Sequence, residues 1–166
     1  MRKHFFLVLS LFFLLVSQSL AIELSGRVLW IYDGDTLKVE KLGKVRLLGI
    51  DTPEYKASPR DHFYMQNFNI EAKKLREIAW QGKKYLISNV KGKRVRLELD
   101  HTQKDKYNRL LAYVYLPDGK MLNRTLLKKG LATVFRRYDF QYKKDFLITE
   151  KKAQKKKLGL WGKSSL

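Results

Sequence analysis

Carboxylates and arginines gather in one stretch of this sequence and in one loop further along it. Asp35, Asp51 and Glu54 lie on either side of Arg46, and Arg109 follows within the segment Asp-Lys-Tyr-Asn-Arg. Carboxylates can hold a hard cation or move a proton, and the planar arginine fork binds two phosphate oxygens at once. This combination is what metal-assisted cleavage of a phosphodiester requires.

The candidate metal ligands are Asp35, Asp51 and the main-chain carbonyl of Thr52. Ca²⁺ prefers carboxylate and carbonyl oxygens, so this set suits it and leaves positions for water and phosphate. An EF-hand is excluded, because a loop starting at Asp33 would have Lys44 at its twelfth position, where a bidentate glutamate is required. Taken alone, the Asp-Gly-Asp segment reads as a hairpin turn and Asp-Thr-Pro as a bend after a strand.

The remaining groups of the expected site divide into phosphate clamps and a base. Arg46 and Arg109 are the candidate clamps, and Glu54 is placed to take a proton from an attacking water. His62 and His101 are isolated in the sequence and lack the neighbours of a histidine-metal motif, so we treat them as ordinary polar residues.

The overall charge favours a polyanionic partner. The formal net charge is +19, with 35 Lys and Arg against 16 Asp and Glu, and cysteine is absent. Nucleic acid is the first candidate partner and anionic lipid the second. Without cysteine, disulfides, thiolate metal sites and a cysteine nucleophile are excluded.

Residues 1–21 have the three-part form of a secretory signal peptide. Arg2 and Lys3 begin it, an apolar run from Phe5 to Val16 follows, and Ala21 offers a small residue for cleavage. The apolar run is shorter than the ~20 residues needed to cross a bilayer. We expect export to a periplasm or to the medium, no stable membrane insertion after cleavage, and one domain over residues 22–166.

Hydrophobic periodicity predicts a small α+β domain built on a closed or partly closed barrel. Alternation predicts strands, and a period of three to four predicts helices. The expected strands are residues 25–32, 36–39, 44–48, 95–99, 110–115 and a short return at 120–122; the expected helices are 71–89, one capped by Asn123 and ended by Gly130, and 139–157. The lysine run on the last helix is interpreted first as a solvent-exposed face and second as a contact for phosphates.

The sequence resembles the thermonuclease family, of which staphylococcal nuclease is the type member. The resemblance runs from Gly26 to Trp161 and rests on four blocks in order, namely residues 31–39, 45–54, 105–115, and 129–132 with the closing 158–161. It implies an OB-fold, a five-stranded β-barrel with about three α-helices. It also implies Ca²⁺-dependent hydrolysis of DNA and RNA that leaves 5′-hydroxyl and 3′-phosphate ends.

The resemblance assigns the same metal, base and clamp roles, and it adds substrate contacts. It implies that Lys106 and Tyr107 contact the phosphate end of the substrate and that Tyr138 packs near the nucleotide. Residues 55–69 match the family's loop poorly, the segment 71–94 is longer than in the type member, and Asn108 stands in place of a glycine. We expect a monomer.

Two other hypotheses would also explain the strong positive charge. A non-catalytic nucleic-acid-binding OB-fold module would need only the barrel and the basic surface. A cationic protein held at an anionic wall or membrane would need the charge alone, and it would be released as salt rises.

Overall fold

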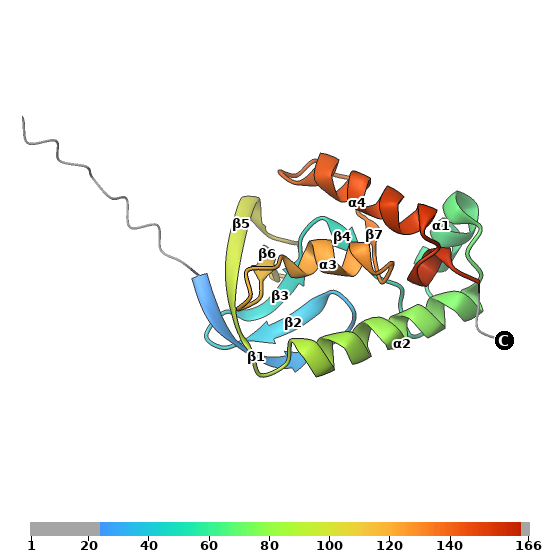
Figure 1. Cartoon of the computed structure of the whole chain (residues 1–166). Coiled ribbons are helices and arrows are strands. Elements are labelled where there is room, and N and C mark those ends of the chain that lie inside the picture. The colour runs from blue at the N-terminus through green and yellow to red at the C-terminus, as the bar shows by residue number, and fades with distance from the viewer. Residues whose placement is uncertain (1–23, 164–166) are drawn as a thin grey trace, which may run out of the picture.

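The computed structural model describes residues 24–163, and these residues build a closed five-stranded β-barrel (Figure 1). The strand order around the barrel is β1-β2-β3-β6-β5. The strands are β1 (Leu24–Ile31), β2 (Thr36–Val39), β3 (Gly43–Leu47), β5 (Arg94–Lys104) and β6 (Leu110–Tyr115). β3 and β6 are parallel, and the other neighbours are antiparallel. The predicted α+β OB-fold class is therefore confirmed.

Strand alternation decides which side chains the barrel turns outward. In β3, Val45 and Leu47 are buried in the barrel, whereas Lys44 and Arg46 lie on its outer face. Arg46 pairs with Thr36 of β2 on one side and with Leu111 of β6 on the other. The centre of β3 thus presents an arginine between two neighbouring strands.

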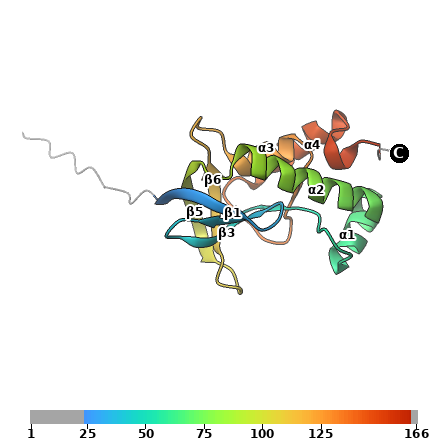
Figure 2. The ribbon, with the colours of Figure 1, turned by 90° about the horizontal axis from the view of Figure 1, so that it is seen from below.

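Helices cover one end and one side of the barrel. They are α1 (Pro59–Phe68), α2 (Ala72–Asn89), α3 (Leu122–Lys128), α4 (Lys143–Lys155) and the 3₁₀-helix η1 (Gly159–Trp161). In Figures 1 and 2, α2 runs alongside the strands near β1, and α3 lies between the barrel and α4. A two-stranded sheet pairs β4 (Ile50–Asp51) with β7 (Thr133–Val134). Within residues 24–163, no helix has the length and apolar character needed to cross a membrane.

Helix α1 is the main element that the sequence analysis did not predict. Ser58 is its N-cap, Pro59 is its first residue, and the Ser58 backbone N–H donates to Asp61 at 3.4 Å. Only Tyr64 of this helix is buried, so its apolar periodicity is weak. The Ser-Pro start was the available signal, because proline is favoured at the first position of a helix.

The expected return strand at 120–122 and the Asn123 cap are both wrong. Met121 makes one isolated bridge to Tyr115, and α3 begins at Leu122 with Met121 as its N-cap. The last helix begins at Lys143 rather than Asp139 and ends at Lys155.

Asn123 is instead a buried connector between α3 and the barrel. Its Oδ1 accepts the Val114 N–H at 3.0 Å, and its Nδ2 donates to the carbonyls of Leu48 at 2.9 Å and Ala112 at 3.2 Å. The side chain is fully buried, so the loss of this amide would remove the acceptor of the Val114 N–H, whereas the Ala112 carbonyl would keep the Leu48 N–H.

We expect Asn123→Ala to lower the free energy of unfolding by roughly 2–4 kcal/mol, because three hydrogen bonds of one fully buried side chain would be lost. Urea unfolding followed by circular dichroism measures this change. Asn67→Ala is the matched control, since the exposed Asn67 makes one bond from Nδ2 to the Phe63 carbonyl. Equal effects of the two substitutions would contradict the connector role.

Candidate active site

Arg46 joins two of the three predicted acids in a single ion-pair cluster. Its Nη1 lies 2.6 Å from Asp35 Oδ1, and its Nη2 lies 3.2 Å from Asp51 Oδ1. Asp35 directly precedes β2, Arg46 lies in β3, and Asp51 ends β4, so three elements meet at this point. The Thr52 N–H donates to Asp35 Oδ2 at 3.4 Å, which places the third expected metal-binding residue in the same cluster.

The tip of the β1–β2 hairpin is held close to the Asp51–Thr52 segment. A Cβ added to Gly34 would lie 2.8 Å from Thr52 Oγ1 and 2.9 Å from Thr52 Cβ, so only glycine allows this approach. Asp33 shapes the same turn by accepting the Asp35 N–H at 3.0 Å. The predicted hairpin turn therefore holds Asp35 beside the Asp51–Thr52 segment.

Arg60 is a site residue that the sequence analysis missed. It lies in the first turn of α1, and its Nε and Nη2 donate to Asp51 Oδ2 at 3.1 and 2.6 Å. The Tyr64 hydroxyl, one helical turn later, donates to the same oxygen at 3.2 Å. Asp51 therefore has an arginine on each carboxylate oxygen. The missed helix start at Ser58-Pro59 was the signal that could have located Arg60.

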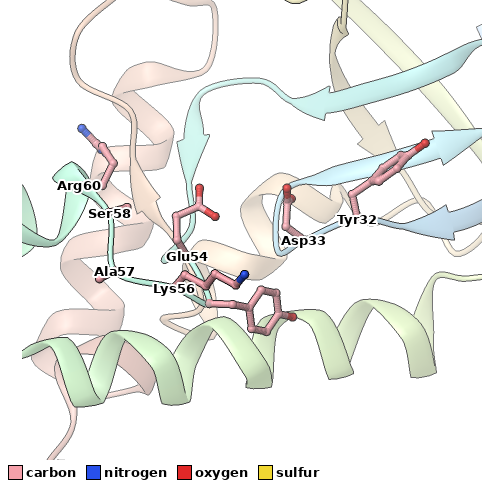
Figure 3. A pocket seen from close by; sticks show the side chains of 8 residues that line it. Tyr32, Asp33, Glu54, Lys56, Ala57, Ser58 and Arg60 are labelled. Atoms are coloured by element: carbon pink, nitrogen blue, oxygen red, sulfur yellow. The ribbon is translucent and has the colours of Figure 1, made fainter.

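Glu54 faces a cavity of about 460 Å³ beside this cluster. The cavity is lined by Tyr32, Asp33, Glu54, Tyr55, Lys56, Ala57, Ser58 and Arg60. In Figure 3 the Glu54 carboxylate projects between Arg60 on one side and Asp33 on the other. Burial, together with the nearby charges of Asp33 and Asp51, raises the pKa of Glu54 above its ordinary value. A carboxylate with a raised pKa and access to a cavity is suited to accept a proton.

The cluster is locally rich in negative charge although the chain as a whole is strongly basic. Burial raises the pKa of Asp35 to about 7, and the charges of Asp33 and Asp51 add to the effect while Arg46 opposes it. Asp35 and Asp51 in turn raise the pKa of the Arg46 guanidinium against the effect of its burial. A buried carboxylate held beside other carboxylates is stabilised by a bound cation.

The donor set fits a hard cation. Asp35, Asp51 and the Thr52 carbonyl offer only oxygen atoms, which is the chemistry that Ca²⁺ prefers. Across residues 24–163 there is no group of three or more His, Asp or Glu side chains arranged to hold an ion. Any cation at this position would be bound by two side-chain carboxylates, a main-chain carbonyl and external ligands.

Arg109 is not joined to this cluster by a contact. Its Nε and Nη2 each lie 2.7 Å from Asp105 Oδ2, and its own loop orients it. Arg109 directly precedes β6, where Leu111 pairs with Arg46, so strand alternation places Arg109 on the same outer face roughly two residues (~7 Å) along the sheet. Asn108, which stands in place of the family's glycine, adopts φ of 59°, a left-handed conformation that asparagine tolerates.

The other predicted substrate contacts are exposed. Tyr107 is 67% exposed, and its ring has Lys106 Nζ at 5.0 Å and the Arg109 guanidinium at 5.3 Å from its centroid. Tyr138 is 60% exposed and lies 5.7 Å from Phe135, ring to ring. These three side chains are free to meet a ligand, and their roles stay predictions.

Comparisons with known proteins give one consistent family. Residues 44–163 match the family described as staphylococcal nuclease homologue. The thermonuclease of Staphylococcus hyicus is 37% identical over 144 residues, which are 84% of this chain and 76% of that protein. The endonuclease YncB of Bacillus subtilis (strain 168) is 40% identical over 139 residues, or 80% of this chain and 59% of that protein. An uncharacterized protein of Methanocaldococcus jannaschii, MJ1439, is 36% identical over 151 residues, or 84% and 72%.

The family match contains most of the site but not all of it. Arg46, Asp51, Thr52, Glu54 and Arg109 lie inside the matched residues 44–163, whereas Asp35 precedes them. The structure brings Asp35 to the matched part through the Arg46 ion pair and the Thr52 N–H.

Proposed function

The chain belongs to the staphylococcal nuclease family, and from that premise we propose that it is a Ca²⁺-dependent nuclease that hydrolyses DNA and RNA, leaving 5′-hydroxyl and 3′-phosphate ends. One observation carries the proposal: Arg46 bridges Asp35 and Asp51 beside the cavity that Glu54 faces. Relatives named thermonuclease and endonuclease support it.

Two arginines serve the phosphate in this proposal. The bonds from Arg46 to Asp35 and Asp51 use one N–H from each terminal nitrogen, which leaves other donors of the guanidinium for phosphate oxygens. Arg109 lies on the same outer face and supplies a second fork once a phosphate competes with Asp105. Preorganised positive charge of this kind lowers the barrier by neutralising the equatorial oxygens in the transition state.

Glu54 acts as the general base. Its carboxylate accepts a proton from the attacking water, and its raised pKa makes it a better acceptor than an ordinary surface glutamate. The cavity beside it has room for water and for part of a nucleotide.

Asp35, Asp51 and the Thr52 carbonyl would hold the calcium ion. When bound there, the ion would supply positive charge next to the scissile phosphate. Because the ion would also neutralise Asp35 and Asp51, the Arg46 fork would then be less engaged by these two acids and more available to the substrate.

Arg60→Gln is expected to strengthen calcium binding by roughly 3- to 10-fold, because Arg60 and the cation compete for the Asp51 carboxylate. Isothermal titration calorimetry with CaCl₂ measures the dissociation constant. Arg124→Gln is the control, since the Arg124 side chain is about as exposed as that of Arg60 and pairs with Asp145 at 2.7 Å between α3 and α4. Unchanged or weaker calcium binding in Arg60→Gln would contradict the competition.

We also propose that residues 1–21 are a cleaved signal peptide and that the mature protein is exported. These residues lie outside the part of the chain that the structure describes. Mass spectrometry of protein recovered from the periplasm and the medium should give a mature chain starting at residue 22. An intact N-terminus in a cell-associated product would contradict export.

A digestion assay tests the proposed function. Purified protein is incubated with single-stranded and duplex DNA and with RNA, in parallel with Ca²⁺, Mg²⁺ and chelator. We expect degradation with Ca²⁺, none with chelator, and products that accept a 5′-phosphate from a polynucleotide kinase without prior dephosphorylation. Equal degradation in chelator would overturn the metal assignment, and binding without cleavage would favour the non-catalytic module.

A further inference from the structure

A strip of aromatic and basic side chains continues from the candidate active site along the outer face of β1, β2 and β3. We define this strip as Trp30, Tyr32, Lys38, Lys44 and Lys91. The register aligns Trp30 with Lys38 across β1 and β2, and Lys38 with Lys44 across β2 and β3. Because directly paired residues share one face of a sheet, these three side chains form a row on the outside of the barrel.

An irregularity in β1 turns Trp30 outward. The pairing of β1 with β2 shifts between Val28 and Trp30, and Val28 and Ile31 are buried. Between these two core positions, both Leu29 and Trp30 are exposed, at 42% and 52%. A β-bulge of this kind changes the direction of side chains, and here it places the Trp30 indole on the surface instead of in the barrel core.

Lysines flank each aromatic ring of the strip. Lys91 Nζ lies 4.6 Å from the Trp30 ring centroid, and Lys44 Nζ lies 4.9 Å from that of Tyr32. Within residues 24–163, none of Lys38, Lys44 and Lys91 forms a salt bridge with a carboxylate. The strip therefore combines the exposed Trp30 ring and the partly exposed Tyr32 ring with three lysines that form no salt bridge within the described residues.

The strip is continuous with the site. Tyr32 lines the cavity that Glu54 faces, and in Figure 3 its ring lies at the end of that cavity remote from Arg60. Arg46 is the next outward-facing residue of β3 after Lys44, so Lys44, at one end of the row, lies two residues (~7 Å) along β3 from the proposed phosphate clamp.

We propose that this strip is an extended substrate site that binds single-stranded nucleic acid on one side of the scissile phosphate. A base stacks on Trp30, a second base stacks at Tyr32, and backbone phosphates pair with Lys38 and Lys44. The proposal rests on the proposed nuclease function and specifies its substrate class. An exposed Trp30 ring and a partly exposed Tyr32 ring beside lysines fit unpaired bases, because in a duplex the faces of the bases are stacked on one another and cannot reach a protein ring.

The first test measures binding in chelator, where cleavage is not required. The probe is a fluorescein-labelled single-stranded deoxythymidine 12-mer, titrated with wild type, Trp30→Ala, Trp30→Phe and Trp80→Ala. Trp80 is the matched control, because it is 60% exposed on α2 and lies outside the strip. We expect the dissociation constant to rise roughly 5- to 100-fold in Trp30→Ala, to recover in large part in Trp30→Phe, and to stay unchanged in Trp80→Ala. Equal affinity of wild type and Trp30→Ala, or equal losses in Trp30→Ala and Trp80→Ala, would overturn the proposal.

The second test separates the strip from the chemistry. For Trp30→Ala with Ca²⁺, we expect KM for the 12-mer to rise with little change in kcat, and the kinetics on a mononucleotide nitrophenyl ester to match wild type. The double variant Lys38→Gln/Lys44→Gln should reduce the slope of log Kd against log salt by about 1.4. A KM and a salt slope like those of wild type would overturn the strip while the nuclease stands. If the wild type binds the 12-mer through Trp30 but does not hydrolyse it, the nuclease function is overturned and the strip stands as a binding site.

Discussion

Glu54→Gln is expected to lower kcat for hydrolysis of single-stranded DNA by roughly 10²- to 10⁴-fold. Glutamine keeps the size of the side chain but cannot accept the proton of an attacking water. Glu54 is exposed to the cavity and its carboxylate makes no ion pair with Arg46, so the fold and the affinity for substrate should be retained. Single-turnover cleavage and binding of the same oligonucleotide in chelator measure the two effects separately.

Glu40→Gln is the control for this substitution, since Glu40 lies after β2 and outside the cavity. It should leave kcat unchanged. If Glu54→Gln also cleaves at the rate of wild type, the Glu54 carboxylate is not the base.

Arg46→Lys is expected to lower kcat/KM by roughly 10²- to 10³-fold, although it keeps the positive charge. A guanidinium reaches Asp35 and Asp51 at once through Nη1 and Nη2, whereas a single ammonium group cannot reproduce both contacts and still offer two donors to phosphate. Steady-state kinetics on a single-stranded oligonucleotide measure the loss, and thermal unfolding reports the effect on the cluster.

Arg124→Lys serves as the control, because Arg124 pairs with Asp145 between α3 and α4, away from the cavity. Full activity of Arg46→Lys would show that charge alone is sufficient at this position. The same comparison at Arg109 asks whether the loop arginine also acts through its fork or only through its charge.

The barrel could be predicted from the sequence because inward-facing and outward-facing residues alternate in β3 and in the first part of β5. The ranges predicted for β2, Thr36–Val39, and β6, Leu110–Tyr115, agree with the structure, and β3 is displaced by one residue. Helix α1 could not be found in this way, because only Tyr64 is fully buried, Phe63 and Phe68 are partly buried, and the apolar periodicity is weak. The helix cap predicted at Asn123 is wrong for a different reason. Asparagine is favoured as a helix cap, but here its side chain forms tertiary hydrogen bonds with Val114, Leu48 and Ala112.

The site was predictable in its residue types but not in its pairings. Chemistry and family resemblance single out Asp35, Arg46 and Asp51, and the structure joins these three. Sequence spacing could not show that Arg60 also binds Asp51 or that Asp105 holds Arg109, because both contacts depend on how a helix and a loop return to the strands. The strip of aromatic and basic side chains could not be predicted either, because it depends on the register of β1, β2 and β3, which a bulge in β1 shifts.

The most direct test of the central claim is a crystal structure of Glu54→Gln with Ca²⁺ and a short single-stranded phosphorothioate oligonucleotide. The account predicts one calcium ion, identified by its anomalous signal, bound by Asp35, Asp51 and the Thr52 carbonyl, with a backbone phosphate in contact with Arg46. An ion bound elsewhere, or a phosphate that contacts neither Arg46 nor the ion, would contradict it.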